Sequence, residues 1–216
     1  MSLRLRCATC RVQSCREASG GSEPPSFCPV VGAPEVLARA REVYRSVPAT
    51  RELAAAAARV EAAGYCRWPR VEEVMEFARR LGTARLGIAT CVGLLREAGL
   101  LREILEANGF EVHSVCCKVG SIPKEELGLA DEEKIRPGSF EALCNPVAQA
   151  ELLNEAGTGL NIVVGLCVGH DSLFFRHSRA PVTVLVAKDR VTGHNPVAAL
   201  YTGHSYYRRL KTPRAT

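Results

Sequence analysis

From residue 84 onward the chain alternates short apolar segments, rich in β-branched residues, with longer helical segments. The apolar segments cover residues 85–90, 110–116, 161–166 and 182–187. Strands of this composition that are joined through helices pair in parallel and are covered on both faces. The sequence therefore predicts an α/β fold with a mainly parallel, Rossmann-like sheet flanked by helices.

The residues before this pattern divide into a cysteine-rich segment and three predicted helices. The helices cover residues 34–47, 50–64 and 69–81, and proline or glycine residues mark their boundaries. The first 33 residues contain Cys, Gly, Ser and Pro with little periodicity. We therefore expect a small Cys-rich metal-binding lobe at residues 1–33 and an α/β domain at residues 34–216.

Two short motifs each occur twice in the predicted α/β region. Cys-Val-Gly stands at residues 91–93 and 167–169, and Asn-Pro-Val-Ala stands at residues 145–148 and 195–198. Their shared order predicts an internal duplication in which residues 84–157 correspond to residues 160–210. The first copy is longer because it contains a polar loop at residues 120–138, and loops of this length often bind ligands.

Four of the ten cysteines lie within the first 28 residues, with the spacing C-x2-C-x4-C-x12-C. Thiolates this close in sequence suit zinc or an iron–sulfur cluster, and a C-x2-C turn lets two sulfurs reach one ion. Disulfide pairing is the alternative. No apolar stretch follows the basic N-terminus as in a secretory signal, so we expect a cytoplasmic protein with reduced thiols. The spacing predicts a metal site formed by Cys7, Cys10, Cys15 and Cys28.

A second set of cysteines follows the predicted strands. Cys91, Cys117 and Cys167 each come just after a strand, and Cys144 precedes the helix start at Asn145-Pro146. In an open parallel sheet, ligands bind outside the carboxyl ends of the strands. We therefore expect these four cysteines to line one pocket that binds a cofactor such as an iron–sulfur cluster. The alternatives are burial as small apolar side chains and catalysis by a thiol.

Four polar residues near these cysteines are candidate catalytic groups. His170 and Asp171 follow the last of the four cysteines, and His194 takes the place of the third cysteine in the second copy. An imidazole can transfer protons at neutral pH, and the Asn145 amide can orient a ligand. The sequence contains no G-x-G-x-x-G, P-loop, G-x-S-x-G or H-E-x-x-H motif, so it assigns no reaction.

The net charge of +5 reflects basic residues at both ends of the chain. Nucleic-acid-binding arms commonly combine such charge with aromatic residues, which are absent around Arg4, Arg6, Arg11 and Arg16. Positive charge beside cysteines instead favours their thiolate form. We expect a small-molecule ligand rather than nucleic acid as the partner. We also expect no membrane segment, since no apolar run approaches about 20 residues.

Several longer motifs resemble one protein family. They are VEEVMEFA at residues 71–78, CKVG at residues 117–120, CNP at residues 144–146 and LCVGHDSLF at residues 166–174. The chain resembles the uncharacterised metal-binding family numbered eighteen forty-seven among domains of unknown function, found in bacteria and archaea. The resemblance covers nearly the whole chain, including the N-terminal cysteines and the segment from His194 to Tyr207. It implies metal binding through Cys7, Cys10, Cys15 and Cys28 with no assigned activity.

Together these patterns predict a metal-binding protein of unassigned activity, with an N-terminal four-cysteine zinc or iron–sulfur site on an α/β ligand-binding domain. The alternative is an iron–sulfur redox enzyme that uses the cysteines at the strand ends. The identity of the bound metal separates these two functions.

Overall fold

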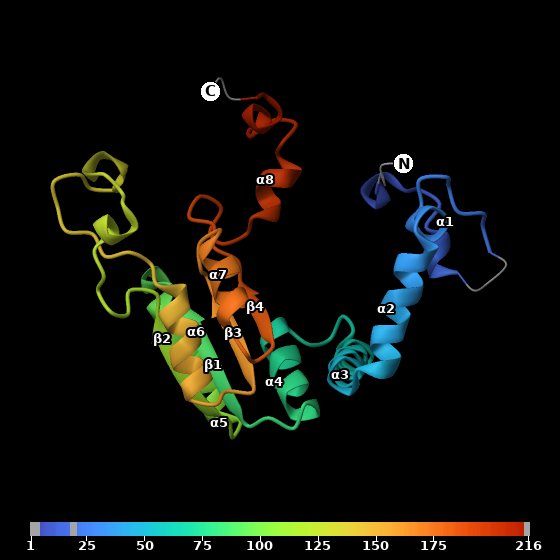
Figure 1. Cartoon of the computed structure of the whole chain (residues 1–216), viewed down its shortest axis with the longest axis horizontal. Coiled ribbons are helices and arrows are strands. Elements are labelled where there is room, and N and C mark those ends of the chain that lie inside the picture. The colour runs from blue at the N-terminus through green and yellow to red at the C-terminus, as the bar shows by residue number, and fades with distance from the viewer. Residues whose placement is uncertain (1–4, 18–20, 214–216) are drawn as a thin grey trace. The chain divides into compact units, whose positions relative to one another are not determined.

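A computed structural model describes residues 5–17 and 21–213 of the chain (Figure 1). The chain forms two compact units, Met1–Arg59 and Val60–Thr216. The predicted lobe at residues 1–33 falls within the first unit, and its residues 1–4 and 18–20, Arg4 among them, lie outside the described part. The boundary predicted between residues 33 and 34 stays a prediction.

The described part of the first unit is helical after residue 28. Two 3-10 turns, Cys7–Thr9 and Ser14–Arg16, precede helices α1 (Pro29–Gly32), α2 (Pro34–Ser46) and the start of α3 (Pro48–Gly64). The predicted helix at residues 50–64 begins two residues earlier, at Pro48. Proline is favoured at the first position of a helix because it has no N–H and its φ is already helical.

The second unit contains a four-stranded sheet in the order β2-β1-β3-β4, with every pair parallel. The strands are β1 (Arg85–Thr90), β2 (Glu111–Cys116), β3 (Leu160–Val164) and β4 (Val182–Val186). The predicted α/β fold is confirmed, and each strand begins and ends within two residues of its predicted bounds. Thr90 pairs with both Cys116 and Val164, so the carboxyl ends of the three strands meet at one edge.

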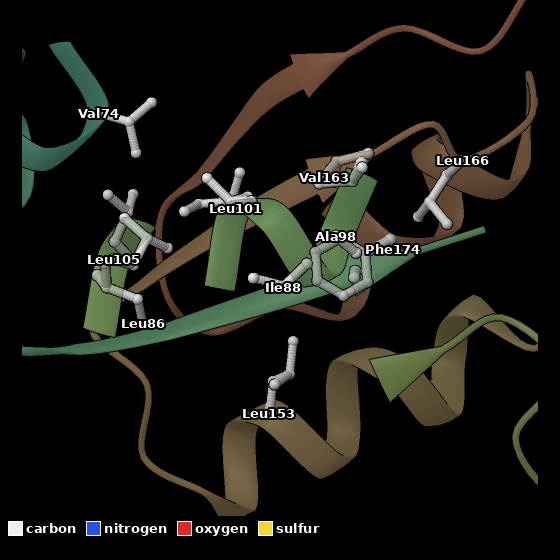
Figure 2. Packing of buried hydrophobic residues seen from close by; sticks show 14 of the residues in the cluster. Val74, Leu86, Ile88, Ala98, Leu101, Leu105, Leu153, Val163, Leu166 and Phe174 are labelled. Atoms are coloured by element: carbon white, nitrogen blue, oxygen red, sulfur yellow. The ribbon is translucent and has the colours of Figure 1, made fainter. Parts of the chain in front are cut away.

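The strand order reverses between β1 and β3. The chain moves outward from β1 to β2 through α5 (Leu95–Ala107), and outward in the other direction from β3 to β4 through α7 (His170–His177). Because parallel crossovers are right-handed, α5 covers one face of the sheet, and α7 covers the other face beside α6 (Pro146–Glu155). Figure 2 shows Leu101 and Leu105 of α5 and Leu153 of α6 on opposite sides of β1.

The core lies on both faces of the two central strands. β3 is buried along its whole length and β1 in all but its first residue, whereas the edge strand β4 is only half-buried. Leu86, Ile88, Leu153 and Phe174 are fully buried and pack in this cluster (Figure 2). Strands enclosed by neighbours and helices read as continuous apolar runs, which is why the sequence showed them clearly.

Three further features match or refine the sequence-based expectations. Helix α4 (Arg70–Arg80) ends before Gly82, whose φ of 69° is the left-handed conformation that glycine adopts easily. The polar loop at residues 120–138 contains two 3-10 turns, and an isolated bridge between Pro123 and Ala142 closes it. Among the described residues, no helix is long and apolar enough to cross a membrane.

The repeated motifs adopt partly similar local structures. After each Cys-Val-Gly, the next N–H donates to the cysteine carbonyl at 2.9 Å, from Leu94 to Cys91 and from His170 to Cys167. In the first Asn-Pro-Val-Ala, Pro146 is the first residue of the ten-residue helix α6, whereas in the second the five-residue α8 (Val197–Tyr201) starts one position later in the motif, at Val197. The duplication of residues 84–157 in residues 160–210 stays a prediction that one superposition of both motif pairs would test.

Candidate functional site

The candidate site lies where the strand order reverses, at the carboxyl ends of β1 and β3. The ladder continues past the strands, because Cys91 N–H donates to the Val164 carbonyl at 3.1 Å and Cys117 N–H donates to the Thr90 carbonyl at 2.8 Å. Both cysteines are buried. Reversal points of this kind are where open α/β sheets bind their ligands.

Cys117 and Cys144 form a direct pair at this edge. The backbone N–H of Asn145 donates to the Cys117 carbonyl at 2.8 Å, which joins the helix start to the end of β2. The two thiols lie close enough for each to shift the pKa of the other. The Cys117 sulfur also accepts a hydrogen bond from Val92 N–H at 3.3 Å. Cys117, which the sequence places at the end of β2, therefore lies beside Cys144, which comes from the start of α6.

The two thiols of the pair have opposite acidities. The pKa of Cys144 is lowered to about 5, first by its interaction with Cys117 and then by the nearby Lys118 and His170, while burial acts in the opposite direction. The pKa of Cys117 is raised, first by its interaction with Cys144 and then by burial. The surroundings therefore favour the thiolate form of Cys144 and the thiol form of Cys117.

Lys118 is placed beside Cys144 by the backbone of the loop after β2. Its ammonium group donates to the Ala142 carbonyl, two residues before Cys144. The loop is closed there, because Leu143 N–H donates to the Ile122 carbonyl at 2.8 Å. The closure of the loop thus brings the ammonium group of Lys118 close to the sulfur of Cys144.

Cys167 contacts a cation that follows β4. A guanidinium N–H of Arg190 donates to the Cys167 sulfur at 3.1 Å. This contact raises the pKa of Arg190, and the charges of Cys91 and Cys144 raise it further. Arg190 therefore lies close to three of the four predicted cysteines, and the sequence held no signal for it.

Lys188 also reaches this edge, close to Cys91. A Cβ atom on Gly93 would lie 3.4 Å from the Lys188 Nζ atom and 4.0 Å from the Cys91 sulfur. Because Gly93 has no side chain, the ammonium group of Lys188 can approach the backbone at this position. The edge therefore carries the positive charges of Lys118, Lys188 and Arg190 beside its thiols.

Three of the four candidate catalytic residues make hydrogen bonds that shape the backbone. Asn145 accepts from Ala148 N–H at 3.0 Å and so caps α6. Asp171 accepts from Gly169 N–H at 3.0 Å and from Ser172 N–H at 2.8 Å. The ring of His194 accepts from Asp189 N–H at 3.1 Å, within the turn that presents Arg190. These bonds give each of the three residues a structural role, and a catalytic role for them stays a prediction.

His170 differs from the other three candidates. Its Nδ1 atom is buried and has no hydrogen-bond partner among the described residues. The residue lies close enough to Cys144 for its charge to lower the pKa of that thiol. An unpaired ring nitrogen beside a thiolate can hold or supply a proton.

A small cavity of about 270 Å³ opens beside Cys144. Its wall is mostly apolar, with Glu126 and Asn145 as its polar members. Cys144 belongs to this wall and Cys117 does not. The apolar lining consists of Ile122, Leu127, Leu143, Pro146, Val147 and Leu173.

The N-terminal cysteines are all reduced, and none of them is buried. Cys10 N–H donates to the Cys7 carbonyl at 3.0 Å, and the Cys10 sulfur accepts from Gln13 N–H at 3.5 Å. Cys15 lies in the second 3-10 turn, and Cys28 precedes α1. Within residues 5–17 and 21–213, no three His, Cys, Asp or Glu side chains converge on a possible metal position. Metal ligation by the four N-terminal cysteines stays a prediction, as does cofactor binding by the four at the strand ends.

The fold and the site together define an α/β protein with cysteines gathered at the edge of the sheet where its strand order reverses. The chain belongs to the family described as protein of unknown function (DUF1847), which matches residues 28–185. A relative from Methanocaldococcus jannaschii, Uncharacterized protein MJ0455, is 47% identical over 159 residues, which cover 74% of this chain and 80% of that protein. The family match includes all four strand-end cysteines, but it begins at Cys28 and so leaves out Cys7, Cys10 and Cys15.

Proposed function

We propose that this chain is a metal-binding protein whose N-terminal lobe holds one zinc ion or one iron–sulfur cluster through Cys7, Cys10, Cys15 and Cys28. The observation that carries the proposal is the turn from Cys7 to Cys10, with the Gln13 N–H donated to the Cys10 sulfur. A C-x2-C turn brings two sulfurs to one ion, and backbone N–H groups directed at sulfur stabilise bound thiolates.

The charge of the lobe suits a site of four thiolates. Arg6, Arg11 and Arg16 are exposed on the same short segment as the first three cysteines. Four thiolates around a divalent ion leave a net negative charge, which nearby guanidinium groups offset. When bound, the metal would cross-link a segment whose short helices bury none of their residues.

Elemental analysis of anaerobically purified protein tests this proposal. We expect about one zinc ion per chain, or the iron and sulfide of one cluster, because the four cysteines suffice for a single site. The C7S/C10S double variant should lose that metal, and C66S should keep it because Cys66 is an exposed thiol outside the lobe. Full metal content in C7S/C10S, or none in the wild type after reconstitution, would contradict the proposal.

A second candidate function is redox chemistry at the carboxyl edge of the sheet, acting on a small-molecule ligand. The neighbouring thiols of Cys117 and Cys144, with Cys144 in the wall of a cavity, favour it. This redox function could use either an iron–sulfur cluster in the α/β domain or the thiols themselves, and the C7S/C10S variant distinguishes the two. Iron that remains in the variant would belong to a cluster in the α/β domain, whereas an iron-free variant leaves the thiols themselves as the redox groups.

A further inference from the structure

We propose that Cys144 and Cys117 form a redox-active dithiol that reduces a small organic disulfide bound in the cavity beside Cys144. The proposal deepens the second candidate function and does not depend on the N-terminal metal. It rests on the contact between the two cysteines, on the unequal access to them and on the cationic groups around them.

The backbone already holds the two cysteines at a suitable separation. The bond from Asn145 N–H to the Cys117 carbonyl, 2.8 Å long, joins the two segments at the position of the pair. The bond links the peptide unit that follows Cys144 to the carbonyl of Cys117, so the two backbones are adjacent, and a disulfide connects Cα atoms about 4.4–6.8 Å apart. Because this backbone bond holds the two segments together and the thiols lie close enough to interact, we expect a disulfide between Cys117 and Cys144 to need little movement of the backbone.

Access and charge assign different roles to the two sulfurs. Cys144 lines the cavity and is held as a thiolate by its surroundings, so it is the attacking group. Cys117 is 2% exposed and does not line the cavity, so a ligand in the cavity meets Cys144 first. Cys117 is therefore the resolving thiol that attacks the mixed disulfide from within the protein.

The cavity limits the substrate to a small molecule with apolar substituents. Its volume of about 270 Å³ is near the lower end of the usual range for ligand pockets, about 300–1,000 Å³. The apolar wall from Ile122 to Leu173 would hold the organic groups of a disulfide. Lys118 and His170 both act to lower the pKa of Cys144, which favours negative charge on its sulfur.

The reaction balances in two steps. The Cys144 thiolate attacks one sulfur of the substrate R–S–S–R, the substrate S–S bond breaks, and one RS⁻ leaves and takes a proton from His170 or water. Cys117 then attacks the Cys144 sulfur of the mixed disulfide, and its proton goes to the second departing RS⁻. The two protein sulfurs lose two electrons, and the substrate disulfide gains them as two molecules of RSH.

Dithiobis(nitrobenzoate), an aromatic disulfide, serves as the probe, added in one equivalent to the reduced full-length protein at pH 6. We expect peptide mapping to find a disulfide between Cys117 and Cys144 in the wild type. In C117S, the probe's thiol should remain attached to Cys144. C144S should lose the fast phase and react about tenfold more slowly, since an ordinary thiol at pH 6 has far less thiolate, partly offset by its greater nucleophilicity.

The pH profile adds a readout that a merely packed cysteine would not show. Because the pKa of Cys144 is about 5, its reaction rate should change less than twofold between pH 6 and pH 8. An ordinary thiol with a pKa of about 8.5 should speed up roughly 75-fold over the same range. The C116S variant is the matched control, because Cys116 is the adjacent, half-buried thiol and should leave both results unchanged.

Two results would overturn the proposal. One is a probe that reacts at pH 6 without selecting Cys144, or that labels Cys144 in the wild type without forming the disulfide to Cys117. The other is iron or zinc that C7S/C10S retains and C7S/C10S/C144S loses, which would make these cysteines metal ligands. If C144S does not fold, C117S still tests the proposal, because the probe's thiol should remain attached to Cys144 in that variant. Failure of the N-terminal metal proposal would appear in the metal content of the wild type and of C7S/C10S, and would leave the reaction of the probe with Cys144 and Cys117 unchanged.

Discussion

Removal of the N-terminal metal with a strong chelator is expected to open residues 5–17 to protease while the α/β unit stays folded. The short helices of this lobe bury none of their residues, so apolar packing contributes little to its order. The binding free energy of structural zinc acts as folding free energy and amounts to about 10–16 kcal/mol in zinc-finger peptides. Limited trypsin digestion measures the effect through cleavage after Arg6, Arg11 and Arg16.

The C7S/C10S variant provides the matched control for this prediction. It should be cut rapidly at the same three arginines without chelator, because it lacks two of the four proposed ligands. Trp68, the single tryptophan, belongs to the second unit, and its fluorescence should not respond to the chelator. Identical digestion patterns with and without chelator would contradict a structural role for the metal.

The F174A variant is expected to lower the free energy of unfolding of the α/β unit by about 3–5 kcal/mol. Phe174 of α7 is completely buried in the core cluster (Figure 2). Its truncation removes the transfer free energy of the ring and leaves a cavity that the surrounding side chains fill only in part. Urea unfolding followed by Trp68 fluorescence measures the loss, because this tryptophan belongs to the same unit.

Phe175 is the matched control for this substitution, since it is the next residue on the same helix and is 43% exposed. F175A removes the same atoms from a position largely in contact with solvent, so its cost should stay below about 1 kcal/mol. Equal losses in the two variants would show that α7 is not anchored through Phe174. A lower urea concentration at the midpoint of unfolding, with an unchanged slope of the unfolding free energy against urea concentration, would identify a change in stability alone.

The predicted fold agrees with the structure because local patterns carry most of the information that it needs. The central strands β1 and β3 have neighbouring strands on both edges and helices on both faces, so apolar side chains occupy most of their positions. Helix ends also follow local rules, such as the Asn145 cap of α6 and Gly82 after α4. The start of α3 was misplaced by two residues because Pro48 was interpreted as a break between helices instead of a helix start.

The site was predictable only to the level of an edge of the sheet. Parallel strands end on the same side, and Cys91, Cys117 and Cys167 follow three strands, so their common location follows from counting residues along the chain. The contacts among side chains did not follow from that count. The bond between Arg190 and Cys167 needs the turn after β4, and the His170 ring nitrogen becomes unpaired only through burial.

The sequence by itself determined the α/β class, the strand segments and the edge at which the cysteines gather, because hydrophobic period and capping act over a few neighbouring residues. Only the tertiary structure decided that Cys117 pairs with Cys144, and that the cavity reaches one sulfur of that pair and not the other. The physical reason is that acidity and access depend on which side chains meet across loops. The closure of the loop between β2 and α6 sets those contacts through backbone hydrogen bonds that join residues far apart in the chain.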